Sequence, residues 1–131
     1  MEKEFIPYTE ALELKELGFD EICPTKYGMT SLKLYKDWKP YKNSDDIYEG
    51  KFYCNDLCAA PLYSQAFRWF REKYNMVGQV NVCTYFIYDM SNNDGFHTTL
   101  KMIKQYDRLC NNYEESEFEC LKKLIAIVKN K

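Results

Sequence analysis

The sequence predicts an α+β fold in which a small single-layer antiparallel sheet of two hairpins packs against three helices, in the order α-ββ-α-ββ-α. Apolar residues recur at three- and four-residue steps in three separate stretches, as they do in helices with one buried face. Two other stretches alternate between the two faces of a strand with period two. The 131 residues show no internal repeat and no linker, so we expect one domain over residues 1–131 with its own core.

The first helix is expected over residues 9–17. Thr9 suits the N-cap because its hydroxyl oxygen can accept a backbone N–H of the first turn. Gly18 suits the position just after the helix, where the backbone turns left-handed. If Gly18 closes a Schellman motif there, Phe19 should contact Leu14.

The first hairpin is expected to pair residues 21–23 with residues 30–35. The second of these stretches alternates in period two, and the turn signal Tyr27-Gly28 lies between them. Residues 36–60 then show no sustained periodicity, and a loop of this length inside a compact domain is often functional. Within it, a short strand is expected at residues 51–54.

The second helix is expected over residues 62–74. Pro61 suits the first turn of this helix, because proline has no backbone N–H and an N–H at that position would have no partner within the helix. Asn75 can end the helix in a left-handed conformation. Trp69 lies off the apolar stripe, so we expect it to be half-exposed and to suit an interface anchor. The alternative is a residue at the edge of the core. The stripe consists of Tyr63, Ala66, Phe67, Phe70 and Tyr74.

The second hairpin is expected to consist of one long strand over residues 78–90 and a returning strand over residues 96–102. Period two places the even-numbered residues of the long strand on one face, and Phe86 is assigned to the core. Residues 91–95 are rich in Asn, Asp and Gly, which favours a turn. A helix over residues 98–109 is the alternative to the returning strand.

The last helix is expected to begin after Asn112. Asn112 suits the N-cap, and Glu115 stands three residues later, in the spacing of a capping box. Glutamates crowd its first turns and lysines follow, an order that complements the helix dipole. Its buried face is expected to consist of Phe118, Leu121, Leu124, Ile125 and Val128.

Composition and charge exclude several classes of protein. Aromatic residues make up 17% of the chain while Gly and Pro are few, which excludes disordered and collagen-like chains. The net charge of −2 argues against a generally basic nucleic-acid coat protein. The charged N-terminus is unlike a signal peptide, and the aliphatic run at residues 124–128 is too short to span a membrane. We therefore expect a cytoplasmic protein without a membrane partner.

The six cysteines are expected to be free thiols, because no secretion signal accompanies them. Cys54 and Cys58 form the only closely spaced pair and are weak candidates for a metal site. Structural zinc usually needs a second such pair, and His97 is the only histidine. We therefore expect no metal and no other cofactor.

Four sequence blocks carry a resemblance to a known family: EFIPY at residues 4–8, LKELGFDE at 14–21, APLYSQAFRWFREKY at 60–74 and YEESEFECLKKLI at 113–125. They resemble a family of small uncharacterised proteins encoded by bacteriophages and by prophage-carrying genomes of gut Bacteroidales. The resemblance implies a phage-type protein in the cytoplasm of the bacterial host. It implies no activity, no catalytic residue and no cofactor.

The candidate binding surface is a basic aromatic loop, residues 33–42. Its lysines and aromatic rings recur every three residues, which suits an extended segment with rings along one edge and ammonium groups along another. Such a segment suits bases and phosphates, a nucleotide or an acidic protein. Alternatively, the rings pin the loop to the core and the lysines remain solvated. The candidate residues are Tyr35, Lys36, Trp38, Lys39, Tyr41 and Lys42, with Arg68, Trp69 and Arg71 on the second helix.

We expect a non-enzymatic protein, because the sequence contains no P-loop, nucleophile elbow or dinucleotide-binding fingerprint. The favoured hypothesis is a protein-binding module that engages a host or phage protein, or a second copy of itself. The alternative is a nucleic-acid or nucleotide binder that uses residues 33–42. One version of this alternative sequesters a nucleotide defence signal.

Overall fold

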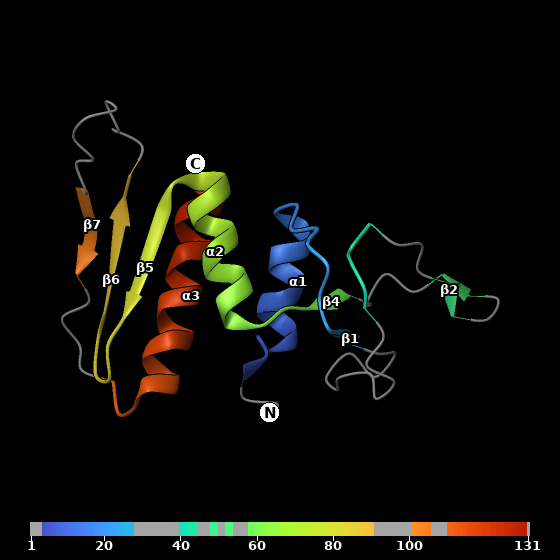
Figure 1. Cartoon of the computed structure of the whole chain (residues 1–131), viewed down its shortest axis with the longest axis horizontal. Helices are drawn as coiled ribbons and strands as arrows, with labels where there is room; N and C mark the ends of the chain where they lie inside the picture. The colour runs from blue at the N-terminus through green and yellow to red at the C-terminus, as the bar shows by residue number, and fades with distance from the viewer. Residues whose placement is uncertain are drawn as a thin grey trace. The chain divides into compact units, whose positions relative to one another are not determined.

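The computed structural model describes residues 4–27, 40–44, 48–49, 52–53, 58–90, 101–105 and 110–130. These residues form three helices and seven strands (Figure 1). The predicted α+β class and the order of its helices and strands are confirmed. The chain divides into two compact units, Met1–Leu62 and Tyr63–Lys131, and each is described by itself. That both belong to one domain stays a prediction.

The first helix, α1 (Tyr8–Glu16), begins one residue before the predicted start. Pro7 occupies the N-cap, and no side chain caps this end, so the predicted role of Thr9 is wrong. The predicted Schellman motif at the other end is confirmed. Gly18 has a φ of 99°, the Phe19 N–H donates to the Leu14 carbonyl at 2.9 Å, and the Gly18 N–H donates to the Lys15 carbonyl at 3.1 Å.

The strands of the first unit form two small antiparallel sheets. In one, β1 (Thr25–Tyr27) pairs with β4 (Cys58–Ala60), and α1 packs against β4. In the other, β2 (Tyr48–Glu49) pairs with β3 (Phe52–Tyr53), which lies within the short strand predicted over residues 51–54. The predicted hairpins therefore do not account for the pairing of β1 with β4.

The partner of Cys23 differs from the prediction. Cys23 exchanges two backbone hydrogen bonds with Tyr41, at 2.8 and 3.0 Å, whereas residues 30–35 were expected to pair there. Residues 30–35 lie outside the described residues. All three residues of β4 are buried, so β1 gains a fully buried partner that is distant in the sequence. The alternation of apolar and polar residues within one strand does not indicate which distant segment pairs with that strand.

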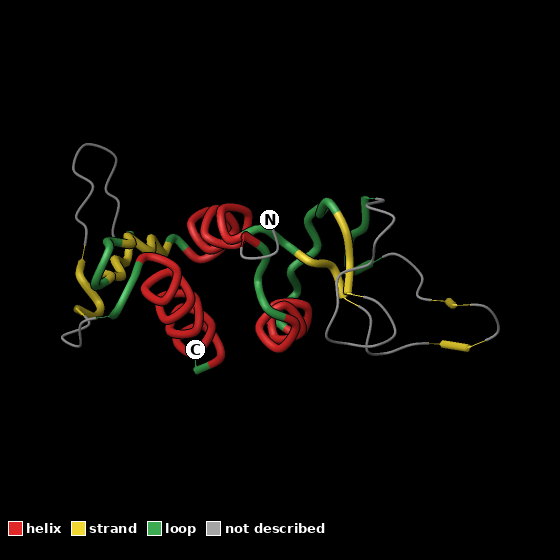
Figure 2. Tube along the Cα trace, turned by 90° about the horizontal axis from the view of Figure 1, so that it is seen from below, coloured by secondary structure: helices red, strands yellow, loops and turns green. Residues whose placement is uncertain are grey.

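The second unit contains a three-stranded antiparallel sheet and two helices, α2 (Tyr63–Tyr74) and α3 (Tyr113–Lys129). Its strands, β5 (Met76–Val80), β6 (Tyr85–Asp89) and β7 (Lys101–Gln105), lie in sequence order. Both helices cover the same face of this sheet (Figure 2). Gly78 lies on that face, and a Cβ atom added to it would contact both helices. It would lie 2.9 Å from the Cys120 Sγ of α3 and 3.0 Å from the Phe67 ring of α2.

The single long strand predicted over residues 78–90 is wrong. The turn at residues 81–84 divides it into β5 and β6, and the Asn81 N–H donates to the Thr84 carbonyl at 2.8 Å. Because Val80 pairs with Tyr85, the inward side changes from even to odd residue numbers across the turn. Tyr85 is therefore buried, and Phe86, which was assigned to the core, is only half-buried.

The returning strand is confirmed in kind but not in its bounds. β7 pairs with β6, so the alternative helix over residues 98–109 is wrong for residues 101–105. Residues 96–100 lie outside the described part of the chain.

Among the residues that the structure describes, no helix is both long and apolar enough to cross a membrane.

The predicted end of α2 at Asn75 and the predicted start of α3 after Asn112 are confirmed. The predicted start of α2 is wrong, because the helix begins at Tyr63 and Pro61 lies before its first turn, where its carbonyl accepts the Ile6 N–H at 2.9 Å. Asn75 has a φ of 55° after the last residue of α2. Asn112 Oδ1 accepts the Glu115 N–H at 2.8 Å, as the predicted N-cap requires. The Glu115 carboxylate accepts the Asn111 N–H at 3.2 Å, in place of the Asn112 N–H that a capping box uses. Phe118 is half-buried instead of buried, with the Lys122 Nζ 4.8 Å from its ring centroid. The buried residues of α3 are Ser116, Cys120, Leu121, Leu124, Ile125 and Val128.

Candidate functional site

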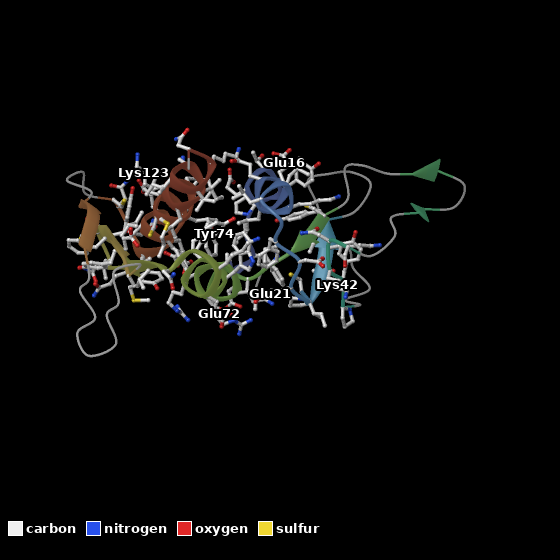
Figure 3. All side chains as sticks on the ribbon, turned by 90° about the horizontal axis from the view of Figure 1, so that it is seen from above. Glu16, Glu21, Lys42, Glu72, Tyr74 and Lys123 are labelled. Carbon is white, nitrogen blue, oxygen red and sulfur yellow. The ribbon has the colours of Figure 1, made fainter. Side chains whose placement is uncertain are left out.

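The basic aromatic loop is described only at its end. Tyr35, Lys36, Trp38 and Lys39 lie outside the described residues. Tyr41 is buried, and the Lys26 Nζ lies 5.1 Å from its ring centroid. Lys42 is exposed (Figure 3). At this end of the loop the aromatic ring therefore packs into the core while the lysine remains solvated, as in the alternative considered for the loop.

Asn43 fixes this end of the loop, a role that the sequence did not indicate. Its Nδ2 donates to the Phe19 carbonyl at 2.7 Å, and its Oδ1 accepts the Ala59 N–H at 2.8 Å. The neighbouring Ser44 N–H donates to Asp20 Oδ1 at 2.6 Å. The amide is suited to this bridge because it both donates and accepts hydrogen bonds. Residues 41–44 are thus tied to the end of α1 and to β4.

Trp69 is buried, with 7% of its surface exposed, so the predicted half-exposure is wrong. Its ring meets Phe70 and Tyr74 edge-on, with centroids 5.2 and 5.4 Å apart. The Lys73 Nζ lies 5.1 Å from the Trp69 centroid. Because α2 packs against both β5 and α3, its buried sector is wider than one apolar stripe.

Arg68 and Arg71 are exposed on α2. They share its outer surface with Glu72, which leaves the helix on the side opposite Tyr74 (Figure 3). They belong to the second unit, whereas the described end of the loop belongs to the first. Arg68 and Arg71 are therefore considered as a basic face of α2 alone.

The weak metal candidates are not brought together with other ligands in the described residues. Cys58 is buried in β4, and this burial raises the pKa of its thiol to about 12, which disfavours the thiolate that zinc needs. Cys54 lies outside the described residues. Within the described ranges, no three His, Cys, Asp or Glu side chains could hold a metal ion. The described cysteines are free thiols: Cys23, Cys58, Cys83, Cys110 and Cys120.

An exposed apolar cluster, here called the turn patch, consists of Val82, Cys83 and Tyr113. Val82 is 65% exposed and Tyr113 is 45% exposed, and they are two of the three large apolar side chains exposed among the described residues. The Ser116 Oγ donates to the Val82 carbonyl at 3.2 Å, and Ser116 lies one helical turn after Tyr113. The β5–β6 turn and the start of α3 are thereby held side by side.

The sequence did not reveal the turn patch because it placed Val82 inside a continuous strand. The clearest available signal was Asn81, a residue type that favours turns. The structure also adds an acidic border, since Glu114 and Glu115 occupy the first turn of α3. Burial raises the pKa of the Tyr113 phenol, and Glu117 and Cys120 raise it further. The phenol therefore remains neutral and able to donate a hydrogen bond at physiological pH.

A second partly exposed surface lies on the side of the β5–β6 ribbon opposite Gly78. Val77 and Tyr88 are directly paired across the two strands, and both are half-buried. The Phe86 and Tyr88 rings have centroids 6.4 Å apart and an interplanar angle of 27°. Gln79 pairs with Phe86 and is exposed. This face therefore combines two aligned aromatic rings with an exposed amide.

Comparison with models of protein families, with curated proteins and with solved structures found no significant match.

Proposed function

We propose that the protein is a protein-binding module and that the turn patch is part of its contact surface. The observation that carries this proposal is the hydrogen bond from Ser116 to the Val82 carbonyl, which joins two segments that each carry an exposed apolar side chain, Val82 and Tyr113. Tyrosine is enriched among the residues that dominate interface energies. Full burial of a valine-sized side chain contributes about 1.5–3 kcal/mol, so a partner that covers both residues gains a substantial share of its affinity there.

The chemistry of the patch suggests the chemistry of the partner. An apolar contact bordered by Glu114 and Glu115 favours an apolar socket with basic groups at its rim, since complementary charge speeds association and fixes orientation. A host or phage protein, or a second copy of this chain, is the partner class we propose. The phage context rests on the resemblance of the four sequence blocks alone.

Glutamate substitutions on two exposed side chains test the proposal. Val82→Glu places a charge in the turn patch, and Ile22→Glu places the same charge on the 67% exposed Ile22 of the first unit. Self-association is measured by light scattering over a concentration series, and host partners are measured by quantitative capture. We expect Val82→Glu to weaken the complex at least about tenfold and Ile22→Glu to leave it unchanged. Equal binding by both variants would contradict the proposal.

The second candidate function is binding of a single-stranded nucleic acid or a nucleotide. The neighbouring Phe86 and Tyr88 rings on β6 favour it. Sheet faces that bind single strands use exposed aromatic rings as platforms for bases, each worth about 1–3 kcal/mol. Anisotropy of a labelled single-stranded oligonucleotide measures this activity. Phe86→Ala and Tyr88→Ala should each weaken binding, while Lys36→Glu with Lys39→Glu tests the basic aromatic loop separately. If none of these substitutions changes the affinity for the oligonucleotide, neither the Phe86 and Tyr88 face nor the basic aromatic loop binds it.

A further inference from the structure

We infer that Cys83 and Cys110 form a site of reversible disulfide formation in the second unit. The Cys110 N–H donates to the Cys83 carbonyl at 2.6 Å, so the backbones of the two cysteines are in direct contact. Both thiols are free in the structure. Cys83 lies in the β5–β6 turn, and Cys110 lies two residues before Asn112, the N-cap of α3.

The hydrogen bond limits how far apart the two residues can be. With standard bond lengths, an N···O distance of 2.6 Å holds the two Cα atoms no more than about 6.5 Å apart. Disulfides join residues whose Cα atoms are roughly 4.4–6.8 Å apart. The Cα atoms of the pair therefore lie within the upper distance limit for a disulfide.

Exposure distinguishes Cys83 from the other described cysteines. Cys23, Cys58 and Cys120 are fully buried, and burial raises the pKa of each thiol to about 12, so their reactive thiolates are scarce. Cys83 is exposed and can meet an oxidant directly, whereas Cys110 is buried beside it. This arrangement gives Cys83 the role of the attacking thiol and Cys110 the role of the resolving thiol.

The oxidant is a low-molecular-weight disulfide such as oxidised glutathione. The Cys83 thiolate attacks one sulfur of this disulfide, which breaks its S–S bond and releases one small thiol. The Cys110 thiolate then attacks the Cys83 sulfur of the mixed disulfide and releases the second small thiol. The protein loses two electrons and two protons, and the oxidant is reduced to two thiols.

The bond would restrain the two segments that carry the turn patch. It would connect the turn next to Val82 with the segment just before Tyr113. Its effect on a partner rests on the proposed function, but its formation does not. A reductant would reopen the link, so the surface would respond to the thiol–disulfide balance of its surroundings.

The test uses the whole folded chain, oxidised glutathione and peptide mapping under non-reducing conditions. We expect a linked Cys83–Cys110 peptide, a mass lower by two hydrogens, and maleimide labelling of Cys83 that falls by at least about tenfold and recovers with dithiothreitol. Cys110→Ser should leave Cys83 stably glutathionylated, and Cys83→Ser should show neither product. Cys120→Ser serves as the matched control and should retain the linked peptide.

Two outcomes would overturn the inference. One is stable glutathionylation of Cys83 in the wild-type chain, because it shows that Cys110 does not resolve the mixed disulfide. The other is a linked peptide that joins Cys83 to a different cysteine. The readout contains no partner, so its failure leaves the protein-binding proposal intact, and failure of that proposal leaves the linked peptide unaffected.

Discussion

Both units bury aromatic side chains, but they differ in the aromatic side chains that they leave partly exposed. In the first unit, Tyr27 and Tyr41 are buried, and the Tyr27 hydroxyl donates to the Ile6 carbonyl. In the second unit, Phe86, Tyr88 and Tyr113 remain partly exposed. The first unit is the one in which the sequence suggested an aromatic binding surface. Tyr41 is the aromatic residue of that surface that the structure describes, and its burial teaches that an aromatic residue in a basic loop is not by itself an exposed one.

The units also differ in how their segments are held. The Asn43 side chain hydrogen-bonds two backbone groups in the first unit, where the strands are only two or three residues long. The second unit instead packs two helices tightly on a sheet at Gly78. We therefore expect polar substitutions to affect the first unit most and steric substitutions to affect the second.

The largest expected effect is that of Gly78→Val. A Cβ atom at this position would lie 2.9 Å from the Cys120 Sγ and 3.0 Å from the Phe67 ring, closer than a core tolerates. We expect the free energy of unfolding, measured by urea denaturation, to fall by about 3 kcal/mol. Gln79→Ala, on the exposed neighbour, should change it by less than about 0.5 kcal/mol.

A pair of variants separates steric crowding from a loss of strand propensity. Gly78→Ala adds only the Cβ atom and should destabilise the chain less than Gly78→Val. In a Cys120→Ala background, which lacks the nearest sulfur, the cost of Gly78→Ala should become smaller. An unchanged cost would show that Cys120 is not the obstacle.

Asn43→Ala has the next largest expected effect. It removes two hydrogen bonds at once, from the Ala59 N–H and to the Phe19 carbonyl, both of which belong to buried residues. We expect a loss of about 2 kcal/mol in the free energy of unfolding, within the range for buried polar groups that lose a bond. Ser44→Ala is the matched control, because the bond of Ser44 to Asp20 uses its backbone N–H.

Hydrogen exchange shows where the Asn43 bridge acts. The Ala59 amide should exchange faster in Asn43→Ala, while amides of β5 and β6 should keep their wild-type rates. A uniform increase across both units would mean that the bridge stabilises the whole chain and not the first unit. That result would remove the contrast between polar and steric stabilisation.

Local chemistry made three of the helix ends predictable from the sequence. Gly18 and Asn75 take left-handed backbones after α1 and α2, and Asn112 caps α3. Each depends on the conformational freedom or side-chain hydrogen bonding of one residue near a helix end. Such features require no knowledge of which distant segments meet.

Three features that the sequence did not predict depend on distant partners. The pairing of Cys23 with Tyr41 joins segments separated by a long stretch of chain. The burial of Trp69 follows from the contacts of α2 with both β5 and α3. The turn patch arises because the β5–β6 turn meets the start of α3, so neither Val82 nor Tyr113 identifies it alone.

The smallest expected effect is a loss of stability at high pH that both units should share. Burial raises the thiol pKa of Cys120 in the second unit from 9.0 to about 12, and Cys23 and Cys58 in the first unit are raised to the same value. A raised pKa of an acid favours its neutral form in the folded state. The resulting stability is fully present below about pH 9 and is lost as the pH rises towards 12.

Urea denaturation at pH 8 and pH 10.5 measures this loss for one thiol at a time. Wild-type protein should lose on the order of 1–2 kcal/mol more than Cys120→Ala between these pH values, because the thiol ionises only in the unfolded chain. Val128→Ala removes a buried apolar group from the same helix and should lower stability equally at both pH values. Cys23→Ala gives the corresponding measurement for the first unit. If the pH dependence changes in Cys120→Ala but not in Cys23→Ala, the first unit admits water to its thiol, and the contrast between the units extends to their cores.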